Sequence, residues 1–216
     1  MLRNLAIRHG LASRGAKWEL YRRTFPPRVG EKVLDVGVSH YETLPGTNYF
    51  LHNYPHQDQV TGVGVTDLSP LEDVYPAARF VQADGRELPF EDGEFDVVHS
   101  NAVIEHVGPD ADQARFAAEL VRVARAGFIT TPNRWFPFEP HTHVPLLHWL
   151  PRSLTLEGMR RLRVRESYDI WLLSRRRFRG LFPSDVETDV VVQRIAGWPA
   201  TMILLFRKGP GARGLT

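Results

Sequence analysis

Short apolar runs alternate with helical patterns along the first 135 residues of the chain. The runs are rich in valine, isoleucine and phenylalanine and end in small or polar residues, which is typical of buried parallel strands. They predict strands at residues 32–37, 60–65, 79–82, 95–99 and 128–131. Between the last two, Phe116, Leu120 and Val123 recur at helical spacing. Asp110 with Gln113 predicts a capping box for that helix, and Gly127 predicts its end.

Strand–helix–strand alternation predicts an α/β fold, with a mostly parallel sheet and helices on both faces. Two further runs, at 186–195 and 201–207, follow each other with only Gly197, Trp198 and Pro199 as an obvious turn between them. Because no helix separates these runs, we expect them to form an antiparallel edge. The 216 residues fit a single domain, with residues 1–30 as an N-terminal helical segment.

Composition excludes several classes of protein. The absence of cysteine rules out a disulfide scaffold, thiol catalysis and cysteine-ligated metal sites. The N-terminus is rich in arginine, as transit peptides are, but Trp18, Leu20 and Tyr21 recur at the spacing of a docked helix. No apolar stretch approaches the roughly 18 residues that cross a bilayer, so we expect a cytoplasmic protein.

The net charge of +2 conceals a segregation of charges. Residues 31–110 hold fifteen acidic and three basic residues, whereas residues 151–182 hold nine arginines and three acids. Arginine is far more frequent than lysine along the chain, and a biased base composition of the gene explains this excess without any function. Because the half with the predicted ligand site is acidic, we expect no nucleic-acid partner.

Small, polar and acidic residues follow the predicted strands. In parallel α/β sheets ligands bind beyond the carboxyl ends of the strands, near the point where the strand order reverses. The residues after the strands are therefore candidates to bind a nucleotide-like ligand. They lie at 37–40, 64–67, 83–85, 100–102 and 132–134.

Three segments, at residues 33–37, 80–90 and 95–106, together resemble class I S-adenosylmethionine-dependent methyltransferases that act mostly on small molecules. The resemblance implies a Rossmann-like, seven-stranded sheet with an antiparallel C-terminal strand, and S-adenosyl-L-methionine as cofactor. It implies that Gly37 lets the backbone approach the cofactor and that Asp35 helps to hold its ammonium group. An acid after strand two would bind the ribose, and Asp84 with Gly85 would bind the adenine. The cofactor-binding residues expected on this basis are Asp35, Gly37, Val38, Asp67, Asp84, Gly85 and Ser100.

The chain departs from the family pattern at two places. The first motif is degenerate, because Val38, Ser39 and His40 follow Gly37 where the family usually has further glycines. Gly64 stands where the family usually has its ribose-binding acid, and Asp67 comes three residues later. From the residues alone, Asp35 and Asp67 are also explained as helix caps, and Asp84 as part of a plain turn.

Histidines are the candidate general bases for an oxygen acceptor, because an imidazole exchanges protons near neutral pH. His106, His141 and His143 follow predicted strands four and five, although a structural role explains each of them as well. His141 and His143 lie two residues apart, as metal ligands do, with Glu105 or Glu139 as a further ligand. Because no third ligand is fixed, we expect no metal site.

Residues 134–182 form a predicted helical, arginine-rich flap after strand five. Its aromatic and apolar residues suggest that it covers an apolar, aromatic or lipid-linked acceptor, and its arginines suggest contact with an anionic membrane. A packed flap with a solvated basic face is the simpler alternative.

The leading hypothesis is methyl transfer to a small molecule. A non-catalytic binding or partner subunit is the alternative, and a nicotinamide-dependent oxidoreductase is third because the G-x-G-x-x-G pattern is missing.

Overall fold

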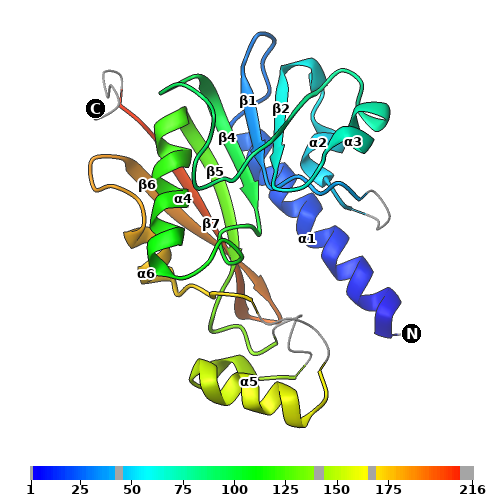
Figure 1. The fold of residues 1–216 in the computed structure, drawn as a ribbon, viewed down its shortest axis with the longest axis vertical. Helices are drawn as coiled ribbons and strands as arrows, with labels where there is room; N and C mark the ends of the chain where they lie inside the picture. The colour runs from blue at the N-terminus through cyan, green and yellow to red at the C-terminus, as the bar shows by residue number, and fades with distance from the viewer. Residues whose placement is uncertain (1, 42–45, 139–143, 165–168, 210–216) are drawn as a thin grey trace.

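The structure is a computed structural model that describes residues 2–41, 46–138, 144–164 and 169–209, with side chains described from Gly10 onward. A single sheet of seven strands forms its centre (Figure 1). The strands are β1 (Val33–Val36), β2 (Val60–Gly64), β3 (Arg79–Gln82), β4 (Phe95–Asn101), β5 (Ala124–Pro132), β6 (Glu187–Ile195) and β7 (Trp198–Arg207). The helices are α1 (Leu2–Thr24), α2 (Tyr49–Asn53), α3 (Ser69–Val74), α4 (Asp110–Val123), α5 (Arg152–Arg161) and α6 (Arg175–Gly180). Two short 3-10 helices, η1 (Gln57–Gln59) and η2 (Leu147–Trp149), complete the elements.

The strand order is β3-β2-β1-β4-β5-β7-β6. Strands β1 to β5 run parallel, and β7 pairs antiparallel with both β5 and β6. The predicted Rossmann-like sheet with an antiparallel C-terminal strand is thereby confirmed. The order reverses between β1 and β4, so the crevice for a ligand lies at the carboxyl ends of these two strands.

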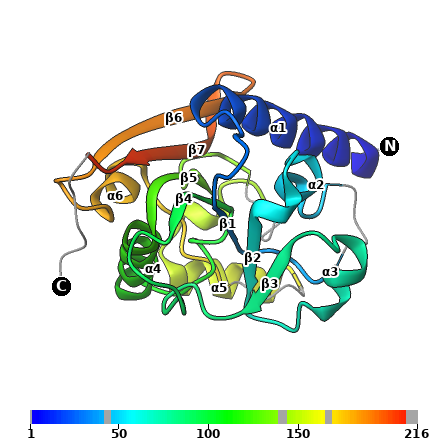
Figure 2. The same ribbon diagram turned by 90° about the horizontal axis from the view of Figure 1, so that it is seen from above.

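Helices cover both faces of the sheet, as Figure 2 shows from above. On one face α1 and α2 pack an aromatic cluster that includes Tyr21, Phe25 and Phe50. On the other face α4 and α6 bury Phe116 and Phe178. The alternation of side chains along β1 distributes its residues between these two clusters, because successive residues of a strand point to opposite faces.

The predicted boundaries of α4 were wrong at both ends. The helix begins directly after Pro109, and Asp110 makes no capping hydrogen bond. Gln113 instead donates to the carbonyl oxygens of Ile104 and Trp171, which ties α4 to two neighbouring segments. Residue Gly127 does not end the helix but lies within β5, where any side chain would collide with the ring of Phe206.

The loop after β3 is held against α4 by one arginine. Arg122 donates to the carbonyl oxygens of Leu88 and Phe90 at 3.0 and 2.8 Å, and it pairs with Glu119 and Asp92. Glu119 in turn accepts a hydrogen bond from the backbone N–H of Leu88. The network fixes the segment that begins with Asp84.

Arg122→Ala is expected to lower the free energy of unfolding by about 2 kcal/mol, because it leaves two carbonyl groups without this donor and removes the guanidinium that pairs with the half-buried Glu119. Arg125→Ala is the matched control. It removes an ion pair in which the arginine side chain is 70% exposed, and such pairs contribute about 0.5 kcal/mol. Urea denaturation measures both values, and equal losses would contradict a special role of Arg122.

Candidate functional site

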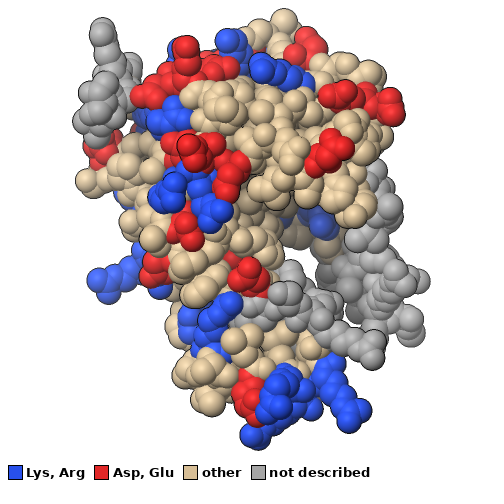
Figure 3. Space-filling model, viewed as in Figure 1, with Lys and Arg blue, Asp and Glu red and all other residues tan. Residues whose placement is uncertain are grey.

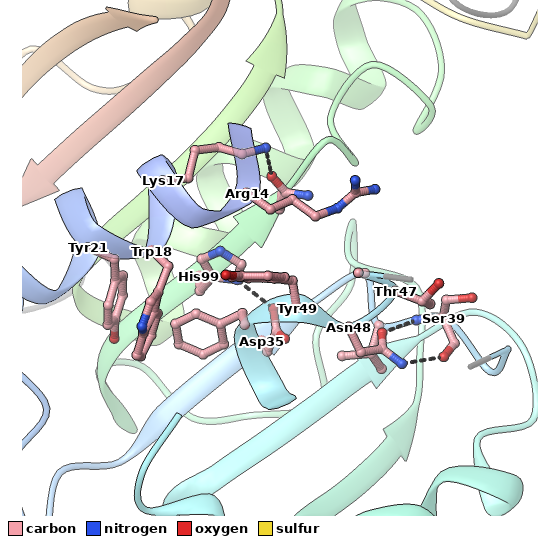
Figure 4. Close-up of a pocket in the computed structure, with 15 residues that line it drawn as sticks. Arg14, Lys17, Trp18, Tyr21, Asp35, Ser39, Thr47, Asn48, Tyr49 and His99 are labelled. Carbon is pink, nitrogen blue, oxygen red and sulfur yellow. Dashed lines mark hydrogen bonds and ion pairs between the residues drawn. The ribbon is translucent and has the colours of Figure 1, made fainter. Parts of the chain in front are cut away.

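Two cavities meet at the turn formed by Gly37, Val38 and Ser39, at the carboxyl end of β1. The first, called the strand-end cavity below, encloses about 400 Å³ over the ends of β1 to β4. Its lining includes Gly64, Thr66, Asp84, Gly85, His106 and Phe116. The second, called the α1 cavity, encloses about 200 Å³ between the sheet and α1 (Figure 4). Its lining includes Arg14, Lys17, Trp18, Asp35, Tyr49 and His99.

The turn after β1 requires glycine at its first position. Gly37 has φ +99°, and a Cβ there would lie 2.1 Å from Cγ2 of Val103. The backbone N–H groups of Gly37 and Val38 both donate to the carbonyl oxygen of Val63, at 2.7 and 3.0 Å. The first motif thus keeps the one glycine whose conformation and packing exclude a side chain.

The residues that replace the family's further glycines are held by α2. The side-chain oxygen of Asn48 accepts from the N–H of Ser39, and its amide donates back to the carbonyl oxygen of Ser39, both at 2.8 Å. Asn48 immediately precedes α2, the short aromatic helix that follows the motif. A side-chain clamp therefore shapes a turn that the family builds from glycine.

Of the two acids predicted to bind the adenine and the ribose, Asp84 lines the strand-end cavity and Asp67 does not. Arg86 holds Asp84 through Nη2 at 2.6 Å and Nε at 3.0 Å, and these hydrogen bonds lower the pKa of Asp84. Asp67 is exposed and accepts hydrogen bonds from the N–H and hydroxyl of Ser69, which lower its pKa. Thr66 is the polar residue that lines the cavity just after β2, with its hydroxyl 3.0 Å from Nδ1 of His40.

Gly85 and His106 also belong to the strand-end cavity. A Cβ at Gly85 would lie 2.5 Å from Cε2 of Phe116, so this glycine lets the loop after β3 pack on α4. Ser100 was predicted to bind cofactor, but it is fully buried within β4 and lines neither cavity. Its hydroxyl has no hydrogen-bond partner among the described residues.

His99 and Asp35 form a buried pair on the α1 face of the sheet. They lie directly opposite each other in the β1–β4 register, and Nδ1 of His99 is 2.7 Å from Oδ1 of Asp35. The imidazole stacks on the ring of Phe50, with centroids 4.0 Å apart. Since Nδ1 faces the carboxylate, Nε2 is the ring nitrogen available to the α1 cavity. His99 was not among the predicted site residues, although its position two residues before the end of β4 placed it near the strand ends that form the site.

Two cations of α1, Lys17 and Arg14, line the α1 cavity (Figure 4). Lys17 Nζ donates to Oδ1 of Asn101, which also accepts from the hydroxyl of Thr130. Burial lowers the pKa of Lys17 to about 8, with a further decrease from the charge of Arg14 and a partial offset by Glu105. Burial also lowers the pKa of Arg14. Neither cation forms an ion pair with an acid in the described ranges, so the cavity offers positive charge to an anionic group of a ligand.

The remaining predicted site residues, His141 and His143, lie outside the described residues, as does Glu139. Within the ranges that the structure describes, no group of three histidine, aspartate or glutamate side chains converges as metal ligands do. No described helix is long and apolar enough to cross a membrane.

Comparisons with known proteins agree with this geometry. Residues 49–129 match the family model of a methyltransferase domain. The chain is 35% identical over 97 residues to a probable S-adenosylmethionine-dependent methyltransferase of Mycobacterium tuberculosis, covering 44% of this chain and 34% of that protein. It is 35% identical over 134 residues to the 2-methyl-6-phytyl-1,4-hydroquinone methyltransferase of Synechocystis, covering 58% of this chain and 38% of that protein. The chain thus spans little more than a third of the length of these two relatives.

Solved structures share the fold at low sequence identity. The PH0226 protein of Pyrococcus horikoshii superimposes with a TM-score of 0.62 and 16% identity, covering 92% of this chain and 91% of that one. The magnesium protoporphyrin IX methyltransferase of Synechocystis, solved with bound S-adenosylhomocysteine, gives a TM-score of 0.56 at 11% identity, over 92% of this chain and 83% of that one.

Proposed function

We propose that this chain, a class I S-adenosylmethionine-dependent methyltransferase, transfers a methyl group from S-adenosylmethionine to a small-molecule acceptor. The observation that carries the proposal is the strand-end cavity, which lies at the reversal of the strand order and is lined mostly by residues of the segment that matches the methyltransferase domain. Ligands of α/β sheets bind at this place.

The residues present fit the cofactor. A cavity of about 400 Å³ lies within the range that encloses nucleoside-sized ligands. Asp84 supplies an ionised carboxylate as acceptor for the adenine amino group, and Gly85 supplies a backbone N–H without a side chain in the way. Just after β2, Thr66 rather than Asp67 supplies the polar side chain for the ribose end.

The amino-acid end of the cofactor would pass over Gly37, Val38 and Ser39 into the α1 cavity, since this turn lines both cavities. There Arg14 and Lys17 would bind its carboxylate, because a buried cation that forms no ion pair within the described ranges favours an anionic partner. The negative charge of Asp35 would attract the ammonium group of the cofactor. When bound, the cofactor supplies a methyl group that is already activated for transfer, so alignment of the acceptor provides much of the catalysis.

For the acceptor, the names of the relatives favour a small apolar or aromatic molecule, since one relative acts on a phytyl hydroquinone and another is a tocopherol O-methyltransferase. An oxygen acceptor needs a base that removes its proton. His106 lines the strand-end cavity, which supports it as that base. His99, oriented by Asp35, is a second imidazole whose Nε2 faces the α1 cavity.

Titration calorimetry with S-adenosylhomocysteine tests the proposal, followed by transfer of labelled methyl groups to a panel of quinols and phenols. Micromolar binding together with transfer supports an active enzyme. Binding without transfer to any acceptor would favour a non-catalytic relative. Failure to bind at millimolar concentration would refute the proposed function.

The affinity for S-adenosylhomocysteine is expected to fall by about tenfold between about pH 7 and about pH 9. The pKa of Lys17 is about 8, so its ammonium is present below this pH and is lost above it, and the cofactor carboxylate then loses one charged donor. Lys17→Arg keeps its charge over the whole range. Because the amino group of the ligand titrates equally with both proteins, calorimetry of native and variant protein isolates the contribution of Lys17. Parallel pH profiles would exclude Lys17 from carboxylate binding.

A further inference from the structure

Large apolar side chains are exposed mainly in one part of the molecule. Of the thirteen such residues in the part of the chain that the structure describes, seven lie between residues 135 and 162. They are Trp135, Phe138, Leu146, Leu150, Leu154, Leu156 and Leu162. Soluble monomers rarely gather exposed apolar residues in one place, and such a patch marks a contact surface.

Four of them, Leu150, Leu154, Leu156 and Leu162, lie on α5 or within two residues of its ends, and α5 projects from the sheet at the lower end of the molecule (Figure 1). The inner side of the helix is anchored, because Thr155 and Met159 are buried and the hydroxyl of Thr155 donates to the carbonyl oxygen of Leu147 at 3.1 Å. At its start, Arg152 donates to the carbonyl oxygen of Ile170 and stacks on the ring of Trp171 at 4.2 Å. The helix is therefore held in one orientation, with Leu154 and Leu156 exposed by 53% and 44%.

The same end of the molecule is basic. Arg160 and Arg161 are each 76% exposed and share a single acid, Glu157. Arg163 follows and is exposed as well. Figure 3 shows Lys and Arg side chains gathered at the lower tip, where Figure 1 places α5, next to acidic side chains. Since two arginines pair with one glutamate, positive charge remains for an external partner.

We propose that this tip docks peripherally on an anionic lipid bilayer. It consists of Leu150, Leu154, Leu156, Arg160, Arg161 and Leu162. Leucines that enter the interface between headgroups and acyl chains, beside arginines that reach lipid phosphates, are the combination that holds amphipathic elements on membranes. A second copy of this chain is the poorer partner, because an isologous contact would bring the two basic tips together. The proposal does not depend on methyl transfer.

Vesicle flotation tests this proposal with the full chain. The native protein is expected to float with vesicles that contain phosphatidylglycerol and to remain behind with phosphatidylcholine alone. Leu154→Glu/Leu156→Glu and Arg160→Glu/Arg161→Glu are each expected to weaken the partitioning at least tenfold. The control Val29→Glu/Val74→Glu replaces two exposed apolar residues elsewhere and should change it less than twofold.

Three results would overturn the proposal. They are no flotation of the native protein, undiminished flotation of the leucine variant, and an equal loss in the control. Thermal melting verifies that each variant is folded, and Leu162→Glu, which lies beyond the helix, replaces the double leucine variant if that one unfolds. Sedimentation velocity tests the alternative partner, a second copy of this chain. If the native protein is a dimer and the leucine substitutions dissociate it, the tip is a self-association surface and the membrane proposal is wrong.

Discussion

Replacing Arg14 and Lys17 together with alanine is expected to weaken the binding of S-adenosylhomocysteine about 100-fold or more, while the binding of 5′-methylthioadenosine changes less than about threefold. The two ligands share the adenosine part, but methylthioadenosine has neither the carboxylate nor the ammonium group. Hydrogen bonds to charged groups contribute about 1.5–3 kcal/mol each, and two such bonds to one carboxylate account for the expected loss. Both cations line the α1 cavity and form no ion pair with an acid in the described ranges, so the internal contact that the substitutions remove is the hydrogen bond from Lys17 to Asn101.

The comparison of ligands separates this prediction from a general loss of structure. Arg22→Ala/Arg23→Ala is the matched control, because it removes two cations of the same helix that pair with Glu19 at the surface. An equal loss for both ligands would show that α1 shapes the cavity without recognising the carboxylate. Unchanged affinity for both would exclude the two cations from cofactor binding. If the native protein bound neither ligand, the proposed function itself would fail.

Gly37→Ala is expected to lower the free energy of unfolding by about 2–5 kcal/mol and to abolish binding of S-adenosylhomocysteine. A left-handed conformation costs a non-glycine residue about 1–2 kcal/mol, and overpacking adds about 1–3 kcal/mol. At Gly37 both penalties apply, because φ is +99° and the new Cβ would overlap Cγ2 of Val103. The turn lies between both cavities, so its displacement disturbs the whole binding site.

Gly30→Ala is the control for the backbone penalty alone. Gly30 has φ +84°, but a Cβ there meets nothing within 4 Å, so about 1 kcal/mol is expected. Gly37→Ala/Val103→Ala removes the clash and should be less destabilised than the sum of its two single substitutions. Urea denaturation measures all four variants. A loss at Gly37 as small as that at Gly30 would contradict the assigned contact with Val103.

Local patterns predicted the fold well, because strands and helices leave their periods in the sequence. The valine-rich runs that became β1 and β4 are buried on both faces of a parallel sheet, and such strands are apolar at nearly every position. Absence of a helix between β6 and β7 predicted their antiparallel pairing. The helix boundaries were less predictable, since Gln113 and Gly127 have side-chain and packing partners from distant segments that override their local preferences.

Local patterns were enough to predict the sheet, the strand ends that form the site, and the places of Gly37, Asp84 and Gly85 at these ends. These follow from short-range patterns and from the rule that parallel strands present their carboxyl ends together. Only the tertiary structure brought His99 to Asp35 across 64 residues, through the β1–β4 register, and Lys17 to Asn101 across 84 residues, through the docking of α1. The tertiary structure also shows that Thr66, rather than the predicted Asp67, lines the strand-end cavity. Such contacts depend on strand register and helix packing, which arise from the burial of the whole core and leave no local period in the chain.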